Sequence, residues 1–355
     1  MKNIFLNSNS TYNSFNTTDI AYVEVEQLFM EDYYVKLFIQ NKLSISGHQP
    51  KIIYTSGATE SLVTCLNWIK SVSPTKTILG TKFDHSCVRD NCENLDLEYE
   101  QVSCENLDLN YSQIEFETCE RISEQQNCTP NSEHSLANVR DNKKYNASTI
   151  VLTIVNPESG EILDYELEYI NQFDFVIFDI TQAIGKLELD LSQVETDYGI
   201  YFSLHKIGGH KNCGVLIIND KNNKFKPLIA GKQQEGLRGG TYDLENYLTI
   251  PELWNNYSKL YDEYEYRKLW NRFYDKLKDY VIAPTHRHLY NTMMLEFKNV
   301  NCILSKIGVL NEHKIYVNAE TSCLTQKNRN RIRLSWTDCK TINDNFDMIV
   351  KLLLN

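Results

Sequence analysis

The sequence predicts an α/β protein with a mainly parallel sheet and a second, smaller α/β domain towards the C-terminus. Short runs rich in β-branched and aromatic residues alternate with segments whose apolar residues recur at helical spacing. This alternation is typical of βαβ units that build a parallel sheet. The chain has 355 residues, which is more than one hydrophobic core usually spans.

The first βα unit has the clearest pattern. Residues 51–55 form a β-rich run, and residues 56–61 (SGATES) supply a glycine turn. Apolar residues at roughly helical spacing follow: Leu62, Val63, Leu66, Trp68 and Ile69. The pattern predicts a strand, a turn and a helix in that order.

The same alternation continues through the first two thirds of the chain. A helix is predicted through Val88 and Cys92 and another over residues 165–171. Strands are predicted at residues 77–81, 97–102, 149–155, 173–178, 187–190 and 214–218. Residues 115–148 interrupt the series, because they are polar, rich in Asn, Ser and Glu, and without periodicity, which is typical of a surface insertion.

After Thr241 the sequence changes character. Residues 244–280 form a long aromatic-rich helical region, whose aromatic stripe indicates packing rather than ligand binding. Strands are predicted at residues 292–297, 315–317 and 332–335, and a helix near Ile303. A terminal amphipathic helix carries Phe346, Ile349, Leu352 and Leu353.

Composition excludes several classes of protein. The formal net charge of −11 disfavours nonspecific binding to nucleic acid or to an anionic membrane. No apolar run approaches the ~20 residues of a membrane span, and the N-terminus turns polar too soon for a signal peptide. The ten cysteines include no Cys-x-x-Cys and no cluster with zinc-ligand spacing. These features predict a cytoplasmic protein with mostly reduced thiols and no metal site.

Two motifs indicate a cofactor. Lys206 ends a Ser-x-His-Lys tetrapeptide that precedes a glycine pair, and Asp179-x-x-Gln182 ends the strand predicted at 173–178. A lysine, a carboxylate and small polar groups are what a protein needs to hold pyridoxal phosphate (PLP). Taken alone, a lysine is usually a surface residue and an aspartate a helix cap, so the interpretation depends on the accompanying residues.

Three further groups follow predicted strands. The Gly57-Ala58-Thr59 turn opens a helix, whose N-terminus can cradle a phosphate. His85 could stack on a pyridine ring, and Asn156 could donate to the ring oxygen. Each has an ordinary alternative: a helix cap, a structural histidine and an Asn-Pro turn. Because all of these groups follow predicted strands, they are expected to converge on one pocket.

The order of these motifs resembles the PLP-dependent class V aminotransferase family and, within it, the NifS-like cysteine desulfurases. The matching stretches are Ser56-Gly57-Ala58-Thr59-Glu60-Ser61, Asp84-His85, Asn156 to Gly160, Asp179 to Gln182, Ser203 to Lys206, and Gln233 to Thr241. The resemblance covers nearly the whole chain except the insertion. It implies the aspartate-aminotransferase-like fold (fold type I), with a seven-stranded, mainly parallel sheet. The large PLP-binding domain would span residues 13–258, and residues 1–12 and 259–355 would form the small domain.

The resemblance also implies roles around the cofactor ring. Lys206 would be the Schiff-base lysine, and Asp179 would face the pyridinium nitrogen. Gln182 and Asn156 would face the phenolate oxygen, with Asn156 also near the substrate. His85 would cover the ring face and take part in catalysis.

Further roles concern the phosphate and the substrate. Gly57, Ala58 and Thr59 would hold the phosphate together with Ser203 and His205. Thr241 would reach the phosphate of the neighbouring subunit, which implies a homodimer. Arg333, in Ile332-Arg333-Leu334-Ser335, matches the family arginine that grips the substrate carboxylate, a task that suits a guanidinium fork.

Cys323 is the residue that distinguishes the predicted reaction. It lies ten residues before Arg333, where the family carries a nucleophilic cysteine on a loop. The resemblance therefore implies removal of sulfur from L-cysteine to give L-alanine and a Cys323 persulfide. An unidentified acceptor protein would take the sulfur, in iron–sulfur cluster assembly or thiolation.

Two departures from the family pattern keep alternatives open. Glu320 stands in the cysteine loop, and His210 stands where a proline is usual. One alternative is another class V PLP enzyme, such as a selenocysteine lyase or an aminotransferase-like relative. The other is a catalytically impaired, homodimeric binding protein with the PLP fold.

Overall fold

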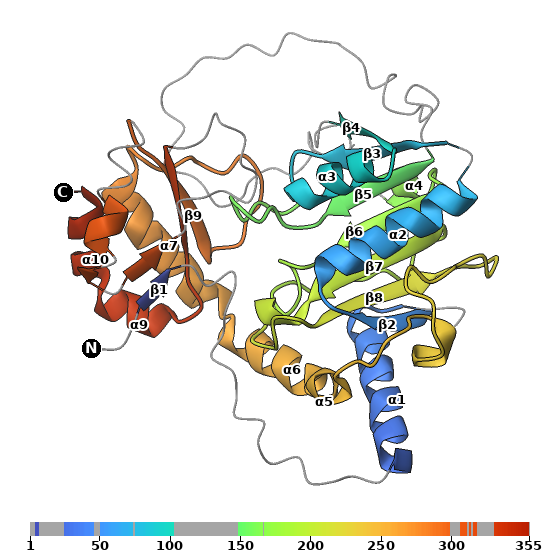
Figure 1. Ribbon diagram of the computed structural model, residues 1–355. Coiled ribbons are helices and arrows are strands. Elements are labelled where there is room, and N and C mark those ends of the chain that lie inside the picture. The colour runs from blue at the N-terminus through green and yellow to red at the C-terminus, as the bar shows by residue number, and fades with distance from the viewer. Residues whose placement is uncertain are drawn as a thin grey trace.

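The computed structural model describes residues 4–6, 25–45, 50–73, 75–102, 148–165, 167–298, 306–310, 312–313, 315–317 and 330–354. The described chain forms a large sheet with helices on both faces and, beside it, a smaller body built mainly from C-terminal elements (Figure 1). The insertion predicted at 115–148 lies outside the described residues, apart from Ser148. The helix predicted near Ile303 also falls on residues that are not described.

The central sheet has seven strands in the order β2-β8-β7-β6-β5-β3-β4. These strands are β2 Lys51–Thr55, β3 Thr77–Thr81, β4 Glu98–Val102, β5 Thr149–Thr153, β6 Phe175–Asp179, β7 Asp197–Ser203 and β8 Gly214–Asn219. Only β8 runs antiparallel to its neighbours, β2 and β7. The other pairs are parallel, which confirms the predicted mainly parallel sheet.

Alternating side chains of the strands face two separate helical layers. In β5, Val151 packs in the cluster with α2 (Ala58–Val72) and α3 (Ser86–Asn94). Its neighbours Ile150 and Leu152 pack in the opposite cluster. The helices of that cluster are α1 Val25–Lys42, α4 Leu167–Ile170, α5 Leu244–Leu248 and α6 Ile250–Leu260. Burial on both faces explains why these strands are continuous apolar runs.

One predicted strand is wrong. Residues 187–190 form no strand, and β7 (Asp197–Ser203) takes its place in the sheet. β6 already pairs with β5 on one edge and β7 on the other, so no edge of β6 is open to residues 187–190. Leu187 and Leu189 instead pack against the core as partly buried side chains.

The smaller body has its own hydrophobic core, which includes Phe273, Trp336 and Phe346. Antiparallel β9 and β11 form one two-stranded sheet, and β1 pairs in parallel with β10. Its elements are β1 Ile4–Leu6, α7 Glu263–Leu277, β9 Thr292–Glu296, β10 Ile315–Val317, β11 Arg331–Ser335, α9 Cys339–Asp344 and α10 Phe346–Leu354. The N-terminal strand thus lies among C-terminal elements. The predicted domain boundaries, after residues 12 and 258, stay a prediction.

The helical region predicted at 244–280 consists of α5, α6 and α7. Asp262 begins α7 as its N-cap, because its Oδ1 accepts hydrogen bonds from the backbone N–H groups of Tyr264 and Glu265 at 3.0 and 3.3 Å. In the described residues, no helix is both long and apolar enough to cross a membrane.

Hydrogen bonds join the smaller body to the loop that follows β5. The Arg333 Nη1 donates to the Pro157 carbonyl at 2.9 Å, and the Leu289 N–H donates to the Gly160 carbonyl at 2.8 Å. The Thr285 N–H donates to Glu161 Oε1 at 2.6 Å. These bonds bring β11, which carries Arg333, to the edge of the large sheet.

Candidate active site

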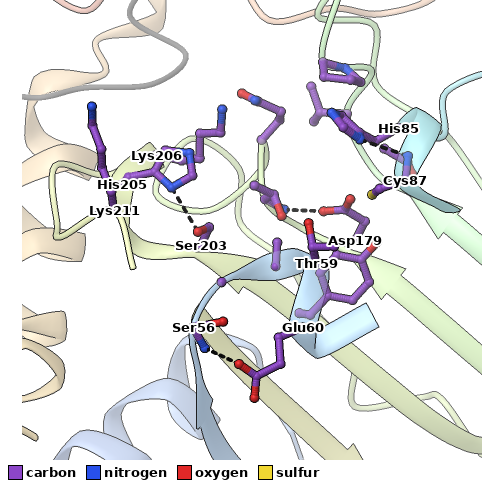
Figure 2. Close-up of a pocket in the computed structure, with 18 of the residues that line it drawn as sticks. Ser56, Thr59, Glu60, His85, Cys87, Asp179, Ser203, His205, Lys206 and Lys211 are labelled. Carbon is purple, nitrogen blue, oxygen red and sulfur yellow. Dashed lines mark hydrogen bonds between the residues drawn. The ribbon is translucent and has the colours of Figure 1, made fainter. Parts of the chain in front are cut away.

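The site is a cavity of about 390 Å³ at the carboxyl ends of the parallel strands. α/β sheets place ligands at this edge, and the volume lies in the ordinary range of ligand pockets. The cavity brings together ten of the residues predicted from sequence: Gly57, Ala58, Thr59, His85, Asp179, Gln182, Ser203, His205, Lys206 and Arg333. Figure 2 shows Lys206 and His205 on one side of the cavity, His85 on another, and Asp179 between His85 and the turn that carries Thr59.

Lys206 ends a short 3₁₀ helix, η3 (Leu204–Lys206), that directly follows β7. The Ile207 and Gly209 N–H groups both donate to the Leu204 carbonyl, which closes the turn beneath the lysine. Burial, with a further effect of the nearby Arg333 cation, lowers the pKa of Lys206 to about 8, while Asp179 acts in the opposite direction. A substantial fraction of Lys206 is therefore a neutral, nucleophilic amine near physiological pH.

Asp179 is the last residue of β6, in register with Thr153 of β5 and Tyr201 of β7. Its Oδ1 accepts a hydrogen bond from the Thr181 N–H at 2.9 Å, which aims the carboxyl group at the cavity. The side chain is buried, and burial raises the pKa of this carboxyl. A buried carboxylate of this kind can bind a protonated ring nitrogen, because a cationic partner offsets the cost of burying its charge.

A further set of residues that line the cavity is suited to binding an anion. Gly57 is the N-cap of α2, so the first N–H groups of a 15-residue helix open towards the cavity, next to the Thr59 hydroxyl. Across from them, Ser203 Oγ and His205 Nδ1 are hydrogen-bonded at 2.9 Å. Burial lowers the pKa of His205 to about 4, so its ring is neutral at pH 7.

Gly214, the first residue of β8, makes the turn at Gly57 possible. A Cβ atom at position 214 would lie 2.5 Å from the carbonyl carbon of Gly57 and 2.6 Å from its Cα. Only a residue without a side chain lets β8 approach the Gly57 backbone so closely.

Glu60 fixes the same turn from within α2. Its Oε2 accepts the Ser56 N–H at 2.8 Å, and its Oε1 accepts the Arg238 Nε at 2.8 Å. Burial is the largest single influence and raises the pKa of Glu60, but the hydrogen bonds from Arg238 and Ser56 together outweigh it and lower the pKa below its ordinary value. Glu60 therefore ties the turn to the segment that continues towards Thr241.

His85 is the N-cap of α3, and its Nδ1 accepts the Cys87 N–H at 3.2 Å. Burial lowers the pKa of His85, so the ring is neutral and carries its proton on Nε2. The ring lines the cavity together with Asp179, and Cys87 lies beside it (Figure 2). The imidazole can therefore stack on a planar ligand and donate one proton.

Arg333 brings a buried cation into the cavity from β11. Its Nη1 donates to the Pro157 carbonyl at 2.9 Å, whereas its Nε is buried without a hydrogen-bond partner among the described residues. Burial lowers the pKa of Arg333, and Glu158 opposes this. A guanidinium with an unmatched donor is a suitable receptor for a ligand carboxylate.

Three predicted site residues are not among those that line the cavity. Asn156 Oδ1 accepts the N–H groups of Glu158 and Ser159 at 2.8 and 3.1 Å, which is the turn that an Asn-Pro sequence favours. Thr241 is exposed on the surface. Cys323 lies outside the described residues. The roles predicted for all three stay predictions.

Sequence reasoning missed several residues that line the cavity: Ser56, Glu60, Cys87, Thr153, Tyr201 and Lys211. Cys87 and Lys211 each follow a recognised motif within a few positions, so motif spacing could have indicated them. Thr153 and Tyr201 reach the site only because both pair with Asp179 across neighbouring strands. No local signal in the sequence reveals that register.

Comparison with known proteins identifies relatives over much of the chain. A family model described as aminotransferase class-V matches residues 40–236. The cysteine desulfurase of Enterobacter agglomerans is 24% identical over 267 residues, which cover 69% of this chain and 60% of the relative. The cysteine desulfurase IscS of Salmonella paratyphi C (strain RKS4594) is 28% identical over 263 residues, covering 68% and 57%. The chain thus spans less than two thirds of the length of these relatives.

Solved structures resemble the chain over nearly its whole length. A NifS-like protein has a TM-score of 0.73 at 19% identity, covering 99% of this chain and 100% of its own. The apo cysteine desulfurase of Thermococcus onnurineus NA1 has a TM-score of 0.73 at 13% identity, covering 99% and 95%. At these identities the likeness confirms the fold predicted from sequence, the α/β architecture of fold type I. Because the family model matches more than half of the sequence, this chain belongs to the aminotransferase class-V family.

Proposed function

We propose that the cavity binds PLP and that the protein is a cysteine desulfurase, which removes sulfur from L-cysteine and releases L-alanine. The observation that carries the proposal is the meeting, in one cavity, of a lysine with a lowered pKa, a buried carboxyl group and an anion cradle. The matched relatives named cysteine desulfurases support the choice of reaction.

The residues present fit the cofactor. Lys206 Nζ would be the covalent attachment point for the cofactor, and Asp179 would bind its pyridine nitrogen. The N-terminus of α2, the Thr59 hydroxyl, Ser203 and His205 hold the phosphate. His85 covers the ring. Bound PLP supplies an electron sink for the charge left at the substrate Cα.

The protein's own groups then handle the substrate. Arg333 binds the carboxylate of L-cysteine through its guanidinium donors, one of which is buried without a partner among the described residues. Lys206 Nζ takes the proton from the substrate Cα, a role that suits an amine with a pKa of about 8. The neutral His85 imidazole orients the reacting group and can hold a proton on Nε2.

Cys323 supplies the nucleophile. Its thiolate attacks the substrate sulfur, so that a sulfur–sulfur bond forms while the bond between sulfur and Cβ breaks. Protonation of the carbon fragment gives L-alanine, and the sulfur stays on the enzyme as a Cys323 persulfide. An acceptor protein takes it in iron–sulfur cluster assembly or thiolation.

A homodimer completes the proposal. Four side chains on one side of α1 are exposed by 38–60%: Met30, Tyr33, Tyr34 and Leu37. The surface connects to the segment around Thr241, because Tyr54 donates to Asp32 of α1 at 2.6 Å and its ring lies 5.7 Å from that of Tyr242. A second copy covering this face would bring Thr241 towards its own cofactor phosphate.

The decisive experiment is sulfide release from L-cysteine by purified, PLP-loaded protein in the presence of a thiol reductant. Wild type is compared with Cys323→Ala and with Lys206→Ala. We expect turnover in the wild type only, with the cofactor still bound in Cys323→Ala. Unchanged sulfide release by Cys323→Ala would refute its role, and PLP-loaded wild type that is inert towards L-cysteine would redirect the search to another amino acid.

A further inference from the structure

Lys186 lies in the tight turn that follows β6, four residues after Gln182, which ends the motif that begins at Asp179. Backbone hydrogen bonds from Ile184 to Ile180 and from Leu187 to Ala183 close this turn. At Gly185 the backbone φ is +72°, and a Cβ atom there would lie 2.9 Å from Tyr257 Cδ1 of α6. The packing of α6 against Gly185 therefore fixes the backbone that carries Lys186.

Among the residues that the structure describes, the Lys186 side chain donates hydrogen bonds to Gln182. Its Nζ donates to the Gln182 backbone carbonyl at 2.9 Å and to the Gln182 side-chain oxygen Oε1 at 3.2 Å. An ammonium group donates hydrogen bonds and cannot accept them. When Lys186 is protonated, the oxygen of the Gln182 amide must therefore face it, and the amide nitrogen must face the other way.

Gln182 is itself buried, and it lines the cavity. Its Nε2 has no hydrogen-bond partner within the described ranges, although its Oε1 is engaged by Lys186. An amide whose oxygen is held and whose NH₂ group is unpaired presents a donor to whatever occupies the cavity. A hydrogen bond from this amide to an oxygen of a bound ligand would contribute about 0.5–1.5 kcal/mol.

We infer that Lys186 is a positioning residue, which holds the Gln182 amide so that its NH₂ group faces the ring oxygen of the bound cofactor. The inference rests on the proposed binding of PLP. It assigns Lys186 no contact with the cofactor, since its effect passes through Gln182. It also explains why a lysine, rather than an apolar residue, occupies a largely buried place beside another cation.

The electrostatic setting supports this assignment. Burial, with a further effect of Lys206, lowers the pKa of Lys186 to about 7. The Tyr257 ring lies 5.8 Å from the Lys186 Nζ and covers it from α6. Both the charged and the neutral form of Lys186 are therefore populated near pH 7, and an anionic ring oxygen nearby favours the protonated form that orients the amide.

The test is a double-mutant cycle on cofactor affinity. PLP is titrated into cofactor-free wild type, Lys186→Met, Gln182→Ala and the double variant, and the Kd is followed by quenching of intrinsic fluorescence. We expect Lys186→Met to weaken PLP binding about tenfold and to shift the visible absorption maximum of the bound cofactor. In the Gln182→Ala background, Lys186→Met should cause no further loss.

Two variants guard against a purely structural effect. Lys70→Met is the matched control, because Lys70 also donates to a backbone carbonyl, that of Leu95, at a place that does not line the cavity. It should bind PLP as wild type does. Gln182→Glu keeps an oxygen for Lys186 but has no NH₂ group, so it should lose as much affinity as Lys186→Met while folding normally.

The outcomes separate this inference from the proposed function. Wild type that does not bind PLP would overturn both. Wild type that binds PLP, with Lys186→Met binding equally well, would overturn the inference alone. An equal loss from Lys186→Met with and without Gln182 would also overturn it, because the lysine would then act by another route.

Discussion

Three influences of different kinds set the pKa of Lys206. Burial in the cavity is the largest influence and disfavours the ammonium form, and the Arg333 cation acts in the same direction. The Asp179 carboxylate acts against both. Because these contributions come from β6, β7 and β11, the motif around Lys206 predicts an attachment site but not its pKa.

Replacing Arg333 by methionine is expected to raise the pKa of Lys206 above about 8, because a repelling cation is removed. Asp179→Asn should lower it, because an attracting anion is removed. Burial remains, so both values should stay below the ordinary 10.5. The measurement is the pH dependence of Lys206 acetylation in cofactor-free protein, resolved by peptide mass spectrometry against exposed lysines as internal references. Shifts in the opposite directions would contradict this account of the site.

The residues that sequence could identify are those in local motifs at strand ends. Lys206, Asp179 and the Gly57 turn each follow an apolar run, and parallel strands carry such positions to one edge of the sheet. Tyr201 reaches the site through register alone, since it pairs with Asp179 from the middle of β7. Arg333 could be assigned from its likeness to a family motif, whereas its position over the cavity depends on contacts between distant segments such as that with Pro157.

At the scale of elements, Asp84 joins three neighbouring strands of the large sheet. Its carboxyl oxygens accept hydrogen bonds from the Thr81 N–H of β3 at 3.0 Å, the Tyr99 hydroxyl of β4 at 3.0 Å and the Thr153 hydroxyl of β5 at 2.8 Å. Burial raises the pKa of Asp84 to about 7, although these hydrogen bonds oppose the shift. The folded protein therefore keeps this carboxyl protonated over a pH range in which the unfolded chain releases the proton.

Asp84→Asn should stabilise the protein at high pH relative to wild type. From about pH 4 to pH 7 the unfolded wild type has lost this proton while the folded state retains it, so wild-type stability falls as pH rises. Asparagine does not titrate, and its amide can still accept the Thr81 N–H while donating to the Thr153 hydroxyl. The difference in melting temperature, variant minus wild type, should grow from pH 4 to pH 7 and then level off, corresponding to roughly 2–4 kcal/mol. A difference that does not change with pH would contradict the assignment.

Gly214 couples β8 to the anion cradle, so a methyl group there should harm both stability and ligand binding. In Gly214→Ala the new Cβ would meet backbone atoms of Gly57 at 2.5–2.6 Å, and backbone cannot rotate away. We expect a loss of about 1–3 kcal/mol in urea unfolding, with weaker PLP binding because the Gly57 turn is displaced. Gly308→Ala is the control, because it meets no atom within 4 Å and lies in a helical segment, where alanine is neutral or stabilising. Equal effects of the two substitutions would refute this explanation.

A strand could be predicted from the sequence where its local residue pattern agreed with its packing in the fold. β2, β3 and β5 are dense in β-branched or apolar residues, and their positions were predicted closely. β7 contains Gly199, which weakens a strand pattern, yet the glycine is needed because a Cβ there would lie 2.5 Å from Cys65 Sγ of α2. Leu187 and Leu189 alternate with polar residues as a strand would, but both edges of the preceding strand β6 are already paired with β5 and β7.

At the scale of the whole molecule, the exposed face of α1 is the feature that a single chain leaves unexplained. Met30, Tyr33, Tyr34 and Leu37 recur three and four positions apart, so they share one side of the helix. The buried side of α1, with Val35 and Ile39, packs on the large sheet. Apolar residues on both sides of a surface helix indicate a second contact, and the proposed homodimer supplies one.

Charges placed on this face should separate the protomers. The double variant Met30→Glu and Tyr34→Glu puts two carboxylates where the proposed interface would bury them, and unpaired buried charges cost several kcal/mol. We expect wild type to sediment as a dimer and the variant as a monomer, at concentrations where the variant's circular dichroism is unchanged.

The monomer should also bind PLP more weakly, because Thr241 of a neighbouring copy would no longer be available to the phosphate. Tyr264→Glu is the matched control: Tyr264 is 71% exposed on α7, away from α1, and its replacement should leave both mass and affinity unchanged. A wild type that is monomeric at micromolar concentration and still binds PLP fully would show that the cavity is complete within one chain. Thr241 would then have no part in the site, and the exposed face of α1 would need another partner.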